Sequence, residues 1–214
     1  MGLSCLAAKA QDAFIIASPS NYGGAGILDT RTARFFPDGN LVFSASFSQP
    51  DDRYALTFQG LPWAELTFRY RINRGIPDGS HSLHDRSFDI KVRLTHEGEH
   101  FPELALGVQD FLGTGVYSGE YLVGSKHWNR FDFSLGLGWG RLGSNATFEN
   151  PFRLFSSHFD TRTLETGRGG VPLFNTYFRG PDVGLFGGII YDTPIENLKL
   201  KLEYSSDAYL TEKK

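Results

Sequence analysis

Residues 64–72 read Ala-Glu-Leu-Thr-Phe-Arg-Tyr-Arg-Ile, and this stretch decides the fold class. Apolar side chains alternate with polar or charged ones at a period of two, which places successive side chains on opposite faces of a β-strand. One face of the predicted strand is therefore apolar, whereas the other carries Arg69 and Arg71.

The same alternation recurs on both sides of this strand. It is found in segments 41–47, 54–58, 88–95, 120–126, 131–140, 183–191 and 198–205. Segment 101–112 also fits a helical stripe, but we predict a strand there because Gly107 interrupts it and both neighbours are predicted strands. We expect roughly ten strands of about 8–10 residues, joined mostly by short turns.

The composition agrees with a chain of many strands. The 214 residues include 25 Gly, 19 Phe and 9 Tyr, and glycine is unfavourable inside helices. A formal net charge of −3 is too balanced for a disordered tail or a nucleic-acid-binding stripe, so no nucleic-acid partner is expected. A single cysteine excludes a disulfide framework and a cysteine-based zinc module.

Two observations, strand length and aromatic positions, favour strands that cross a membrane. The chain has no apolar run of about 18 residues, which excludes a helical span, whereas strands of about 9–11 residues suit a tilted crossing. Aromatic residues near strand ends favour the interface between lipid and water. They are Trp63, Tyr70, Tyr121, Trp128, Trp139, Tyr191 and Tyr204. We therefore predict an all-β fold, an antiparallel up-and-down transmembrane β-barrel or the N-terminal part of one; the alternative is a secreted β-sandwich that binds polysaccharide.

Charged side chains occupy the face opposite the apolar one, and a barrel would turn that face to its lumen. The candidate lumen-facing residues are Arg69, Arg71, Asp89, Lys91, Arg93, Lys126 and Asp132. On strand 120–126 the charged pair Glu120 and Lys126 is set against Tyr121 and Val123. Two roles stay open for these charges: they guide a polar or anionic polymer, or they form salt bridges within the interior.

No motif predicts catalysis, a cofactor or a metal site. His96 to His100 matches H-E-x-x-H, but the match follows a strand and precedes Pro102, so we expect a charged hairpin turn rather than a zinc-binding helix. His81 and His84 lie in a predicted polar loop with Asp78 and Asp85, and we expect ordinary polar loop side chains there rather than a site for a divalent ion. We expect a protein that is not an enzyme.

The N-terminus resembles the end of an export signal. Ala8-Lys9-Ala10 has the small-x-small pattern of a cleavage site, and Cys5 after Leu3-Ser4 weakly resembles a lipoprotein site. We predict that residues 1–21 hold a residual export signal and an N-terminal segment, and that residues 22–214 form the barrel domain.

Three stretches together resemble the YjbH family of outer-membrane proteins linked to exopolysaccharide production. They are Gly24-Ala-Gly-Ile-Leu-Asp-Thr-Arg-Thr-Ala-Arg-Phe-Phe-Pro-Asp-Gly39, Gly107 to Gly115 followed by Glu120 to Val123, and Leu185 to Gly188 with Glu203 to Tyr209. The resemblance spans residues 22–209 and implies a Gram-negative outer-membrane β-barrel that assists exopolysaccharide biosynthesis or export. It implies outer-membrane lipid, exopolysaccharide and polysaccharide-assembly proteins as partners, and it supplies no catalytic residue.

The chain departs from that family in length. Family members are much longer, and residues 212–214, Glu-Lys-Lys, lack the terminal aromatic residue common in outer-membrane barrels. An unclosed sheet would leave unpaired backbone groups at its edges, which lipid does not tolerate. The expectation is therefore a fragment of a larger barrel protein.

Overall fold

The computed structural model describes residues 17–74, 82–163 and 176–210. Within them the chain is all-β, and most of its strands belong to one antiparallel sheet. The strands of this sheet are β3 (Leu41–Phe47), β4 (Asp51–Leu61), β5 (Ala64–Asn73), β6 (Leu83–Thr95), β7 (Glu103–Gln109), β8 (Gly119–Trp128), β9 (Phe131–Gly140), β10 (Phe148–Glu149), β11 (Asp182–Asp192) and β12 (Lys199–Tyr204). Strands β1 (Ser18–Pro19) and β2 (Ala25–Gly26) form a separate ribbon.

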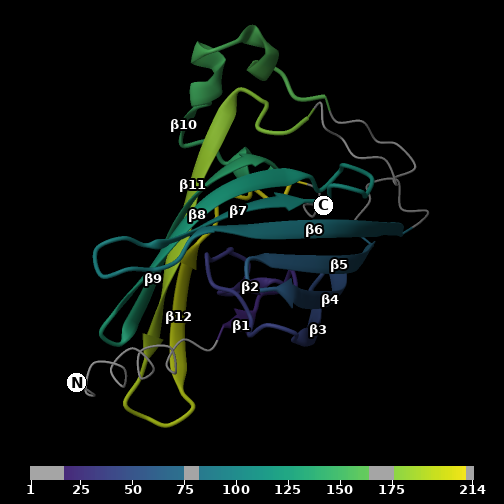
Figure 1. Cartoon of the computed structure of the whole chain (residues 1–214). Helices are drawn as coiled ribbons and strands as arrows, with labels where there is room; N and C mark the ends of the chain where they lie inside the picture. Colours follow the sequence, from purple (N-terminus) through teal and green to yellow (C-terminus); the bar gives the residue numbers. More distant parts are fainter. Residues whose placement is uncertain (1–16, 75–81, 164–175, 211–214) are drawn as a thin grey trace.

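The sheet is an up-and-down meander, as predicted. Strands β3 to β9 pair in chain order, β11 pairs with β9, and β12 and the short β10 both pair with β11. Figure 1 shows β4, β5 and β6 lying across the view while β9, β11 and β12 run steeply, so the sheet is strongly twisted. Among the described residues no ladder joins β3 to β12, so the sheet is not closed into a barrel. They also form no second large sheet, which a sandwich would require.

Segment 101–112 contains strand β7, which confirms the strand prediction over the helical alternative. Leu104 and Leu106 point to one face, whereas the smaller Ala105 and Gly107 point to the other. Gly107 lies beneath the ring of Tyr121, where an added Cβ would come within 2.1 Å of the ring. The glycine that interrupts the apolar pattern is thus required by close packing between neighbouring strands.

The two ends of the sheet carry connections of different length. Connections 48–50, 74–82, 110–118 and 141–181 lie at one end, which we call the loop end. Connections 62–63, 96–102, 129–130 and 193–198 lie at the other, the turn end. The longest connection contains β10 and the short helices η1 (Arg141–Gly143), η2 (Pro151–Leu154) and η3 (Ser157–Phe159), so its described part is ordered structure rather than a plain loop.

Residues 17–40, the N-terminal segment, cover one face of the sheet. We call this the covered face and the opposite one the outer face. Arg31 to Phe36 are all buried. A small apolar core lies between the segment and β7, β8 and β11; it comprises Ala33, Phe35, Ala105, Tyr121, Val123, Leu142 and Phe186. On β9, Gly136 faces this core, and an added Cβ would come within 2.3 Å of the Phe186 ring.

None of the described residues forms a helix that is long and apolar enough to cross a membrane. Residues 1–16, with the predicted export signal and Cys5, lie outside the described residues, as do Asp78 and His81.

Candidate functional site

The candidate site is the contact between the N-terminal segment and the covered face. Its strongest contact is made by Arg34, whose guanidinium lies 2.6 Å from Asp132 on β9, 2.9 Å from Glu103 on β7 and 2.7 Å from Glu97. Burial by itself would lower the pKa of Arg34, but Asp132 and Glu97 raise it above its ordinary value. Arg34 is therefore a permanent cation that joins the segment to three carboxylates.

A second contact lies on β5 and β6. Lys91 Nζ is 3.1 Å from Glu65 Oε1 and donates a 2.7 Å hydrogen bond to the backbone oxygen of Arg34. Glu65 in turn accepts a hydrogen bond from the backbone N–H of Ala25. This buried pair satisfies backbone groups of the segment that would otherwise lack partners away from water.

Three arginines surround the ring of Tyr22 in the segment. The guanidinium carbons of Arg31, Arg53 and Arg69 lie 4.3, 4.7 and 5.4 Å from the ring centroid. Arg69 also pairs with Asp89 at 2.7 Å. Cations over an aromatic face are attracted by its quadrupole, so the ring separates the arginines and stabilises them.

The last strand holds the segment from the other side. Glu203 on β12 accepts hydrogen bonds from the backbone N–H groups of Leu28, Asp29 and Thr30 at 2.9 to 3.1 Å. Lys201 Nζ donates to the backbone oxygen of Ile27. Successive N–H groups that converge on one anion form a nest, and here a carboxylate of β12 occupies it.

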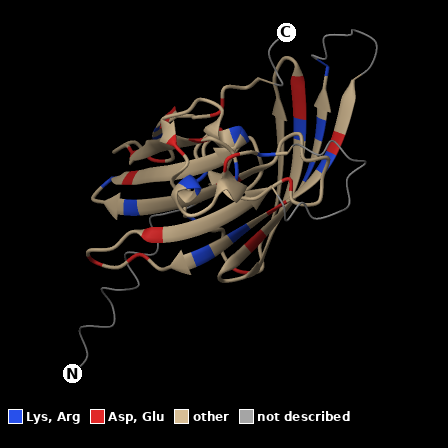
Figure 2. Cartoon of the chain, turned by 90° about the horizontal axis from the view of Figure 1, so that it is seen from above, with Lys and Arg blue, Asp and Glu red and all other residues tan. Residues whose placement is uncertain are grey.

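The segment therefore connects strands β5 and β6 with β12, which are far apart in the sheet order. Acidic and basic positions lie on neighbouring strands in Figure 2, in keeping with these pairs. Two cavities beneath the segment each have a volume of about 20 Å³, room for roughly one water molecule. In the described part of the chain, this region is packed rather than open.

Six of the seven candidate residues share the covered face, and their charges are paired. The pairs are Arg69 with Asp89, Arg71 with Asp51, Lys91 with Glu65, Arg93 with Glu103, and Asp132 with Arg34. Of the two roles left open by the sequence, this arrangement corresponds to salt bridges within the interior.

Lys126 departs from the set. Its register partner on β9 is Phe133, which lies on the outer face, so the Lys126 side chain also leaves its strand on the outer face. Its Nζ turns to the 96–102 connection and lies 3.1 Å from Glu97. The faces predicted for this strand are reversed, because Tyr121 and Val123 lie in the buried core.

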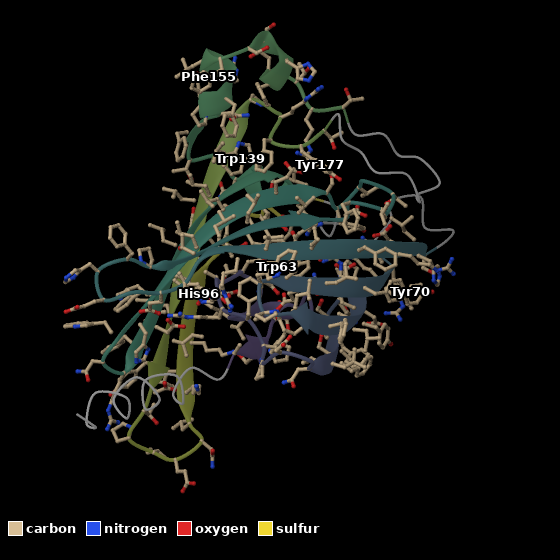
Figure 3. The ribbon with its side chains drawn as sticks, viewed as in Figure 1. Trp63, Tyr70, His96, Trp139, Phe155 and Tyr177 are labelled. Atoms are coloured by element: carbon tan, nitrogen blue, oxygen red, sulfur yellow. The ribbon has the colours of Figure 1, made fainter. Side chains whose placement is uncertain are left out.

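Four of the seven predicted aromatic positions fall into two contrasting environments. Trp63 and Trp128 are exposed at the turn end. Tyr121 and Trp139 are instead buried; Trp139 stacks on Phe152 of η2, below the exposed tip that carries Phe155 in Figure 3. Periodicity identified the strands but not what packs against their ends.

His96 to His100 lie in the connection between β6 and β7, as the hairpin prediction requires. His96 is labelled there in Figure 3. Glu97, the central acid of the H-E-x-x-H match, accepts a hydrogen bond from the backbone N–H of His127 and pairs with Arg34. In the described residues no group of three or more His, Cys, Asp or Glu side chains is placed to bind a metal ion.

Sequence reasoning missed Asp110 at the loop end. Its side chain is fully buried, and its Oδ2 accepts the backbone N–H of Tyr117. Burial and the nearby Asp85 raise its pKa to about 7. Asp110 falls within the strand predicted over residues 101–112, and the sequence carries no signal that β7 ends at Gln109 or that the Asp110 side chain is buried.

The outer face has the opposite composition. Leu135, Leu202 and Phe43 are 66%, 70% and 66% exposed. Among the described strand residues that point to this face, charges occur near the ends of the strands. These charged residues are Asp52, Arg86 and Glu120 toward the loop end and Lys126 toward the turn end. An uncharged band crosses the sheet between them.

Comparison with known proteins assigns the family. Residues 18–214 match the YjbH family, described as "Exopolysaccharide biosynthesis protein YbjH". The chain belongs to the YjbH family. The protein "Uncharacterized lipoprotein YjbH" of Escherichia coli (strain K12) is 38% identical over 199 residues, which are 90% of this chain and 28% of that protein. The chain therefore spans less than a third of the length of this curated relative. No solved structure matches this chain.

Proposed function

We propose that this YjbH-family chain is a non-catalytic β-sheet component of the bacterial outer membrane that assists exopolysaccharide biosynthesis or export. The observation that carries the proposal is the uncharged outer face, bounded by charges at both ends of the strands. Membrane β-barrels turn such an apolar band to lipid and keep polar side chains inside. A water-exposed face of this composition would be an aggregation hazard.

The connections supply an orientation. Outer-membrane barrels have short turns on the periplasmic side and longer loops outside the cell. The turn end would then face the periplasm and the loop end the exterior. The N-terminal segment starts and ends near the turn end, where Lys201 bonds Ser18 and Gln59 bonds Gly39. The E. coli relative is named a lipoprotein, which supports an envelope location for this chain.

A non-catalytic role is supported by the engagement of the charged groups. Glu103, Asp132 and Glu65 pair with cations, and Glu203 accepts hydrogen bonds from backbone N–H groups of the segment. Exopolysaccharide and other polysaccharide-assembly proteins are the proposed partners, together with outer-membrane lipid.

The test combines location with polymer output. We expect the protein to fractionate with outer membranes, to resist extraction by urea and to need detergent, with an electrophoretic mobility that changes on heating. Deletion of the gene should lower extracellular polysaccharide, and re-expression should restore it. Recovery of the protein in the aqueous fraction, or unchanged polysaccharide after deletion, would contradict the proposal.

A further inference from the structure

The outer face is hollowed where it crosses strands β7 to β12. The groove has a volume of about 1050 Å³, at the top of the range of about 300–1,000 Å³ for small-molecule sites. Leucine is the commonest residue of its apolar lining: Leu104, Leu122, Leu135, Leu137, Leu185 and Leu202. Lys126 lies at its margin on the side of the turn end.

The strand register explains the hollow. Leu104, Gly124, Leu135, Gly187 and Tyr204 are successive partners across β7, β8, β9, β11 and β12. Large and small residues therefore alternate along one row of the outer face. The two glycines leave furrows between ridges formed by the larger side chains, and a long flexible chain fits such furrows.

The chemistry of the lining selects the occupant. Strands β8, β9 and β11 are paired on both sides, so the floor of the groove offers no free edge to a peptide strand. Among the described strands, β12 pairs only with β11, but a peptide added to its free edge would extend the sheet beside the groove rather than lie in it. Ser134 and Glu203 border the groove, but their side chains bond Ser125 and residues 28–30 on the covered face. A peptide laid in the groove would leave its N–H and C=O groups unpaired, which is costly, whereas hydrocarbon has none to pair.

We propose that this groove binds an acyl chain of a membrane phospholipid that stays with the protein on extraction. Its head group would lie toward the turn end, beside the partly exposed Lys126 ammonium, which also bonds the backbone oxygens of Gly98 and Glu99 and pairs with Glu97. The inference rests on the proposed function in taking the outer face to contact lipid. It adds a site with defined residues to that surface.

The sharpest variant fills the groove from its floor. A Cβ added at Gly124 would lie 3.2 Å from Leu104 Cδ2, the flexible end of a side chain, so Gly124→Leu should fold. Gly187 is unsuitable, because a Cβ there would lie 2.4 Å from the backbone oxygen of Ser134. Leu202→Trp is a second variant that narrows the groove from β12. Ala45→Leu, on the outer face of β3, adds a similar apolar side chain outside the groove and serves as the control.

The experiment measures phospholipid per chain by mass spectrometry after purification in mild detergent. We expect the wild type and Ala45→Leu to retain the same phospholipid, and Gly124→Leu and Leu202→Trp to retain about tenfold less, which corresponds to lost burial of about two CH₂ groups. Equal retention by all four folded proteins, or none by the wild type, would overturn the inference.

A second arm separates this inference from the proposed function. Dihexanoyl phosphatidylcholine, below its micelle concentration, is titrated into each protein by calorimetry. If the chain is found in the aqueous fraction but the wild type binds this probe more tightly than Gly124→Leu, the membrane proposal fails and the groove inference stands. If the chain is in the membrane but the wild type and Gly124→Leu bind the probe equally, the groove inference fails by itself.

Discussion

The covered face and the outer face of the same strands follow opposite rules. At the covered face, Lys91 on β6 and Arg34 of the overlying N-terminal segment both lie within ion-pair distance of carboxylates. On the outer face, large apolar side chains such as Leu135 stay exposed. Most soluble proteins do the reverse. The comparison teaches that this sheet is built to keep its polar groups away from its surroundings.

Removing the Arg34 cation from the covered face should lower the free energy of unfolding more than any other change. Arg34→Met leaves Asp132, Glu103 and Glu97 without their shared cation. Removing one partner of a buried ion pair costs about 3–5 kcal/mol, and we expect a loss of that size in urea unfolding in lipid vesicles. The control is Arg153→Met, which removes a more exposed cation that pairs with Asp160. Equal unfolding midpoints for the two variants would show that the covered network contributes little.

A charge placed on the outer face sharpens the comparison. Leu135→Arg puts a cation in the middle of the uncharged band, where a lipid-facing arginine costs about 2–4 kcal/mol. Trp128→Arg, at the turn end, should cost about 0–1 kcal/mol, because the penalty falls toward the interface. The measurement is again unfolding in vesicles. If both variants match the wild type, the outer face does not contact hydrocarbon.

Breaking the link between the N-terminal segment and β12 should lower stability by a smaller amount. Glu203→Ala leaves three backbone N–H groups of residues 28–30 without their acceptor. Hydrogen bonds to a charged group contribute about 1.5–3 kcal/mol, so trypsin should cleave after Arg31 faster in this variant. Glu196→Ala, in the exposed 193–198 turn, is the control. Unchanged cleavage in Glu203→Ala would mean that β12 does not hold the segment.

Replacing Asp110 should have the smallest effect, a change in how folding stability depends on pH. Because its pKa is raised to about 7 in the folded chain, the folded state keeps a proton that the unfolded state releases near pH 4. Its contribution to stability therefore falls as pH rises from about 4 to 7. Asp85, Asp89 and Arg69 are the charged groups acting on it.

Asp110→Asn removes this titration and preserves the acceptor for Tyr117 N–H. We expect the variant to melt at a higher temperature than the wild type at pH 8 and at a similar temperature at pH 5. The same difference at both pH values would indicate that Asp110 is ionised in the folded protein.

Much of the fold could be predicted because alternation is local. Residues 64–72 and 198–205 show their two faces directly, and the strands follow. The prediction assigned the two faces of β8 the wrong way round. Tyr121 and Val123 are apolar but lie on the covered face, where the N-terminal segment packs against them in an apolar core. Period two distinguishes two faces but does not say which one another part of the chain covers.

The candidate site was less predictable for the same reason. Arg69 and Asp89 were found by alternation, but their pairing needs the register between β5 and β6. Arg34 and the nest at residues 28–30 lie in a segment without periodicity, and their partners are far away in sequence. Such contacts depend on the path of the segment across the sheet, and local patterns carry no signal for that path.

The most direct test of the central claim is the environment of the outer face. A spin label at Leu135→Cys in a Cys5→Ser background, in outer-membrane vesicles, reports collisions with apolar oxygen and with a water-soluble nickel chelate. A label at Trp128→Cys marks the turn end. We predict high oxygen and low nickel accessibility at position 135, and more nickel accessibility at position 128. High nickel accessibility at position 135 would contradict the account, because the band would then face water.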